Sequence, residues 1–104
     1  MTNKARGEIS IKLGKKTYIM RPTFHALCSI ESQIEKSIID LLLNIVENKP
    51  KISEIHTILK YGMEAYQQTL IHEEDLANLI HETGIVNLLP KVIEFLEYGI
   101  GVKK

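Results

Sequence analysis

The sequence has very little cysteine and no long apolar run, and both shortages narrow what the protein can be. Cys28 is the only cysteine, so the chain can form no internal disulfide, no CxxC metal pair and no redox couple. No stretch approaches the roughly 18 apolar residues that a membrane span needs, and the N-terminal segment MTNKARGE lacks the apolar core of a secretion signal. We therefore expect a protein that stays in the cytosol of the cell that makes it.

The sequence also lacks net charge, because 13 basic residues balance 13 acidic residues. The balance is uneven: residues 1–21 hold six basic residues against Glu8, a net charge of +5, so the remainder of the chain carries −5. A basic segment of this kind can bind nucleic acid, but strands at a surface commonly carry solvated lysines on their outer face. A neutral chain with an acidic remainder is a poor candidate for strong DNA binding.

No motif for catalysis, metal binding or nucleotide binding is present. The four histidines do not form the H-E-x-x-H spacing of a zinc site, and the acidic run at 73–75 lacks the rest of an EF-hand loop. Neither a nucleophile elbow nor a G-x-G-x-x-G or Walker pattern occurs. We therefore predict a non-enzymatic protein with no cofactor and no metal.

The pattern that is present changes at Arg21–Glu31, where strand-like alternation gives way to helical spacing. Residues 7–21 alternate in polarity, and Gly14-Lys15 suits a two-residue type II′ turn, so a β-hairpin with one apolar face is predicted. The predicted cross-strand pairs are Ile9 with Met20, Ile11 with Tyr18 and Leu13 with Lys16. Glu8, Ser10 and Lys12 are expected on the outer, solvated face.

Arg21, Pro22, Thr23 and Phe24 form the predicted structural junction between the hairpin and the helices. Arg21 closes the second strand, and Pro22 disfavours a helical conformation for the residue before it. Thr23 is a good N-cap, and Phe24 begins the apolar face of the helix that follows.

Helical spacing continues through the rest of the chain. The predicted helices cover residues 24–36, 38–48, 53–67, 73–83 and 85–98, with Ser37 and Ser53 as N-caps of the second and third. Pro90 is expected to kink the last helix, or to be the residue at which its main part begins. The fold class is thus α+β and mostly α: a single domain of residues 1–104 in which an N-terminal hairpin precedes a bundle of four to five helices.

The helix predicted at 38–48 has more apolar surface than an ordinary surface helix. Asp40, Asn44 and Glu47 form a narrow polar stripe, and apolar side chains cover the remaining arc of roughly 200°, about twice the usual width. Such a helix is either central to the core or buried on two sides, one of them by a partner. We predict Leu41 and Leu43 as partner-facing residues; the alternative is that both belong to the core.

Residues 7–31 resemble a known family of small tail proteins. The resemblance is carried by Gly7-Glu8, Ile9, Ile11, Leu13, Gly14, Tyr18, Arg21-Pro22-Thr23-Phe24, Ala26-Leu27 and Ile30-Glu31. This pattern is similar to that of the small tail proteins of gene transfer agents and related tailed phages, which are catalogued either as tail assembly chaperones or as tail tube proteins.

The resemblance implies a non-enzymatic role in the cytoplasm of the producing bacterial cell. A tail assembly chaperone is expected to bind the long helical tape-measure protein and keep its apolar surface covered until tail-tube proteins polymerise around it; self-association is also compatible with this role. The first alternative is a structural tail-tube subunit, although one short hairpin offers little strand for closing a ring. The second alternative is a small nucleic-acid-binding regulator that uses the basic hairpin.

Overall fold

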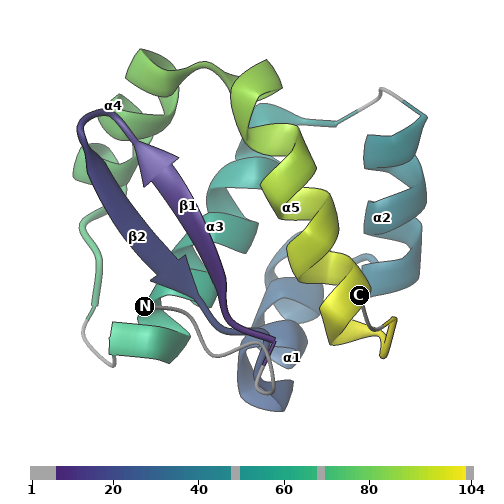
Figure 1. Ribbon diagram of the computed structural model, residues 1–104. Coiled ribbons are helices and arrows are strands. Elements are labelled where there is room, and N and C mark those ends of the chain that lie inside the picture. The colour runs from purple at the N-terminus through teal and green to yellow at the C-terminus, as the bar shows by residue number, and fades with distance from the viewer. Residues whose placement is uncertain (1–6, 48–49, 68–69, 103–104) are drawn as a thin grey trace.

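The computed structural model describes residues 7–47, 50–67 and 70–102, and the statements below concern these residues. The elements are β1 (Ile9–Leu13), β2 (Lys16–Met20), α1 (Phe24–Ile34), α2 (Ile38–Val46), α3 (Ile52–Gln67), α4 (Glu73–Thr83) and α5 (Ile85–Gly99). The predicted fold class is confirmed: an antiparallel hairpin is followed by five helices (Figure 1). The predicted end of the second helix at residue 48 lies outside the described residues.

The hairpin has the predicted register. Ile9 pairs with Met20, Ile11 with Tyr18 and Leu13 with Lys16. Gly14 has a φ of 64°, and Lys15 is not among the positive-φ residues, as a type II′ turn requires. The apolar face of the hairpin is buried against α3, α4 and α5, so the helices supply the support that a lone hairpin lacks.

The structural junction after β2 connects the hairpin to both α1 and α3. The backbone N–H of Arg21 donates to the carbonyl of Gly62 in α3 at 2.9 Å, and the Thr23 hydroxyl accepts from the N–H of Ala26 at 3.1 Å. Thr23 is therefore the N-cap of α1, as predicted. A Cβ on Gly62 would lie 2.8 Å from Cε1 of Phe95, so the glycine is what permits α3 to approach α5 this closely.

Removing the Thr23 cap should weaken the protein modestly. Thr23→Ala leaves the N–H of Ala26 without its side-chain acceptor, so the free energy of unfolding should fall by about 1 kcal/mol. Thr23→Ser keeps a hydroxyl at the same position and is the matched control. Urea denaturation followed by circular dichroism measures both, and an equal loss in the two variants would contradict the capping role.

The buried face of α1 differs from the predicted one. Phe24, which was predicted to begin the apolar face, is 83% exposed, whereas Ala26 is buried. The prediction followed the large apolar side chains, but the small side chain of Ala26 lets α1 pack closely on α3, and Phe24 is then turned outward. The helix also ends at Ile34, before the predicted Lys36, because Glu35 adopts a left-handed conformation and its N–H caps the helix.

The starts of α2 and α3 are set by side-chain caps. Ser37 caps α2 as predicted, since its hydroxyl accepts from the N–H of Asp40 at 3.0 Å. The predicted cap of α3 is wrong: α3 begins at Ile52, which places Ser53 inside its first turn. The buried carboxylate of Glu54 instead reaches back to the N–H of Lys51 at 3.4 Å.

The last helix is continuous across Pro90. It begins at Ile85, so the predicted alternative in which it begins at Pro90 is wrong. A proline at this position removes one hydrogen bond to the carbonyl of Val86. Val86 is 78% exposed and Pro90 is also exposed, so water can satisfy that carbonyl and the helix tolerates the proline.

Candidate interaction surface

Helix α2 presents apolar side chains on two different faces. Ile38, Leu41 and Ile45 are buried in the core, where α2 packs mainly on α5. On the outer face Ile39, Leu43 and Val46 are 55%, 54% and 56% exposed. Their spacing of four and three residues places them in one row, which we call the α2 stripe. Helix α2 lies at the edge of the molecule, on the side of α5 away from the hairpin (Figure 1).

The structure separates the two leucines that were predicted to face a partner. Leu43 lies on the exposed α2 stripe, but Leu41 is 0% exposed and belongs to the core. Two positions along a helix correspond to a rotation of about 200° around its axis, so the two side chains lie on nearly opposite faces and cannot share one. The prediction for Leu41 is therefore corrected, and Ile39 and Val46 are the surface residues that the sequence analysis missed.

A shallow apolar groove adjoins the N-terminal end of the α2 stripe. Its volume is about 250 Å³, and Ile39 belongs to both the stripe and the groove. Gly99 lets α5 approach α1 here, because a Cβ on it would lie 2.9 Å from Leu27. The groove is lined by Phe24, Leu27, Cys28, Glu31, Ser37, Ile38, Ile39, Gly99 and Ile100. We call it the α1–α5 groove.

Carboxylates follow one side of the α2 stripe. Asp40 and Glu47 are exposed and lie three residues before and four residues after Leu43, so both neighbour it on the helix surface. Helix α2 contains no lysine or arginine to neutralise them. The exposed apolar row therefore has an acidic edge, formed by Asp40 and Glu47.

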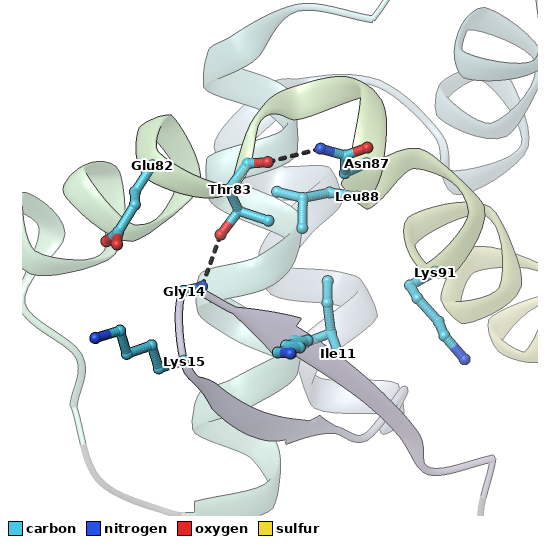
Figure 2. A pocket seen from close by; sticks show the side chains of 9 residues that line it. Ile11, Gly14, Lys15, Glu82, Thr83, Asn87, Leu88 and Lys91 are labelled. Carbon is cyan, nitrogen blue, oxygen red and sulfur yellow. Dashed lines mark hydrogen bonds between the residues drawn. The ribbon is translucent and has the colours of Figure 1, made fainter.

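A second hollow, of about 520 Å³, lies between the hairpin turn and the α4–α5 connection. Figure 2 shows the hydrogen bonds beside it: the N–H of Gly14 donates to the Thr83 hydroxyl at 2.8 Å, and the Asn87 amide donates to the Thr83 carbonyl at 2.8 Å. Its lining is mixed in charge, with Lys15 near Glu82 on one side and Lys91 on the other. The Gly14 bond fastens the hairpin turn to the end of α4, and the Asn87 bond joins α4 to α5. Neither bond has a local signal in the sequence.

The described residues show no constellation for metal binding or membrane insertion. No three His, Cys, Asp or Glu side chains in this part of the chain come close enough to hold a metal ion. Within the same ranges, no helix has the length and apolar character to cross a membrane.

The structural junction contains an ion pair that the sequence analysis did not assign. Glu8 was expected on the solvated face, but it is buried and accepts from Arg21, with Oε2 2.6 Å from Nη2 and 3.0 Å from Nε. The guanidinium also lies over the ring of Tyr66, 5.3 Å from its centroid. The junction therefore has an evident structural role, whereas the three side chains of the α2 stripe are each more than half exposed.

The comparisons with known proteins point to phage-like tails. The model of the family described as phage tail tube protein, GTA-gp10, matches residues 6–100 of the chain. No curated protein and no solved structure matches it. The match covers nearly the whole sequence and includes the hairpin, the junction and α2. The chain therefore belongs to the GTA-gp10 phage tail protein family, in agreement with the resemblance of residues 7–31.

Proposed function

We propose that the protein is a tail assembly chaperone that binds the tape-measure protein and covers its apolar helical surface until tail-tube subunits assemble around it. The α2 stripe is the observation that carries this proposal: three apolar side chains more than half exposed in one row on a small protein. Amphipathic helices bind other proteins through rows of this spacing. The proposed action is binding alone, without a chemical step, in the cytoplasm of the producing bacterial cell.

A structural tail-tube subunit is the second candidate, and the family description favours it because it names a tube protein. A tube built from strands needs sheets that pair from subunit to subunit and close into a ring. In the described ranges of this chain the sheet consists of β1 and β2 alone. The surface available for contacts between proteins is mainly helical, which supports the chaperone role over the tube role.

Co-expression with the tape-measure protein from the same tail gene cluster tests the proposal. We expect the tape-measure protein to become soluble and to co-purify with the tagged chain. Leu43→Ser should lower the recovered tape-measure protein roughly tenfold, because it removes the central side chain of the stripe. Leu70→Ser is the matched control, since Leu70 is 89% exposed and lies outside the stripe.

Two results would contradict the chaperone role. One is equal recovery of the tape-measure protein with Leu43→Ser and with the wild-type chain. The other is the assembly of the purified chain into regular tubes, alone or around the tape-measure protein, which would identify a tube subunit.

A further inference from the structure

We infer that the partner helix of the α2 stripe is amphipathic with a basic edge: its apolar side chains lie on Ile39, Leu43 and Val46, and its lysines or arginines face Asp40 and Glu47. This inference rests on the proposed function and adds the chemistry of the partner to it. The occupant is thus a helix of a different protein rather than a second copy of this chain.

The length of the surface sets the length of the partner helix. Ile39 and Val46 are seven residues apart, which corresponds to about 10 Å along α2. The α1–α5 groove continues the apolar surface beyond Ile39. A partner helix of about three turns would cover the stripe and place one bulky apolar side chain in the groove, beside Phe24 and Ile100.

The carboxylates beside the α2 stripe determine which charge the partner helix should carry on the side that faces them. A helix packed on the stripe brings its flank against Asp40 and Glu47 and removes part of the water around them. Lysine or arginine on that flank is attracted, whereas aspartate or glutamate is repelled.

Symmetry makes a second copy of the chain a poor occupant. In an antiparallel pair of α2 helices related by a two-fold axis, both acidic edges lie on the same side of the interface, so Asp40 of each copy faces Glu47 of the other. In a parallel pair, each acidic edge faces the Leu42 side of the other helix, which offers no cation. Neither arrangement neutralises the carboxylates.

Two designed peptides test the inference directly. Both are helix-stabilised by a side-chain crosslink and have the same leucines at i, i+4 and i+7; one carries lysines along its flank and the other carries glutamates. We expect the full chain to bind the lysine peptide roughly tenfold more tightly by fluorescence anisotropy at low salt. Because surface charges are screened by ions, the difference should shrink at high salt.

Charge reversal on the protein is the decisive variant. Asp40→Lys combined with Glu47→Lys should reverse the peptide preference, and Glu47→Lys alone should reduce it without harming α2, because a cation is favourable at a helix C-terminus. Glu73→Lys combined with Glu74→Lys makes the same charge change on exposed positions of α4 and should leave the preference intact. An unchanged preference in Glu47→Lys and in the double α2 variant would overturn the inference.

The remaining outcomes separate this inference from the proposed function. If the tape-measure protein co-purifies but charge reversal on α2 has no effect on either peptide, the inference fails and the chaperone role stands. If the peptides behave as expected but the tape-measure protein does not bind, the chaperone role fails and the surface chemistry stands. A wild-type dimer in analytical ultracentrifugation that Leu43→Ser converts to monomer would show that the occupant is a second copy, and would overturn the inference.

Discussion

Leu41→Ala should lower the free energy of unfolding by about 2 to 5 kcal/mol, whereas Leu43→Ala should change it by less than about 0.5 kcal/mol. Leu41 is 0% exposed, so its truncation removes buried methyl groups and leaves a cavity between α2 and α5. Leu43 is 54% exposed, and its truncation removes little buried surface. The two substitutions are chemically identical and only two positions apart, so each is the control for the other.

Urea denaturation measures the stability of each variant, and the peptide-binding assay measures the function of the α2 stripe. Leu41→Ala should unfold at lower urea concentration, and the folded fraction should still bind the lysine peptide. Leu43→Ala should unfold like the wild-type chain and bind the peptide several-fold more weakly. Similar losses of stability in both variants would mean that Leu43 is also a core residue, and the α2 stripe would then not be a free surface.

Arg21→Ala should cost about 2 to 4 kcal/mol of unfolding free energy. The Glu8 side chain is 5% exposed, and the guanidinium helps to offset the loss of water around its carboxylate. The substitution also removes the hydrogen bonds from Nε and Nη2 and the contact with the Tyr66 ring. Because the Arg21 side chain is 21% exposed, some water can reach the carboxylate, which places the expected cost below that of a fully buried pair.

A double-mutant cycle isolates the ion pair from the other contacts of Arg21. Glu8→Gln with Arg21→Met removes both charges while keeping similar shapes, and we expect this double variant to be more stable than Arg21→Met alone. Arg21→Lys keeps the charge but loses the planar pair of donors, so its loss should be intermediate. Strictly additive losses in the cycle would show that the two side chains do not interact.

The hairpin and its junction could be predicted from the sequence because local signals determine them. Alternation sets which residues share a face, Gly14 sets the turn, and the turn length sets the register. The same register contains a signal that was not used: if Ile9 faces Met20, the next pair outward is Glu8 with Arg21, which carry opposite charges.

The helix faces were harder to predict because they depend on how helices dock. Helical spacing identified α2 as unusually apolar, but it did not distinguish the side toward α5 from the outer side, so Leu41 and Leu43 were paired wrongly. Helical spacing placed Phe24 on the apolar face of α1, although the close contact with α3 uses the small Ala26. The α1–α5 groove had no sequence signal, because Phe24 and Ile100 come together only in the folded chain.

The bond between Gly14 and Thr83 joins residues 69 positions apart, and β1 also packs on α5. At a ribosomal rate of about 5 to 20 residues per second, roughly 3 to 14 seconds separate the synthesis of these two partners. During that interval the apolar face of the nascent hairpin has no helix α5 to cover it. Docking of the hairpin therefore awaits the synthesis of α4 and α5, and the hairpin is the segment for which cellular folding factors would compete in the meantime.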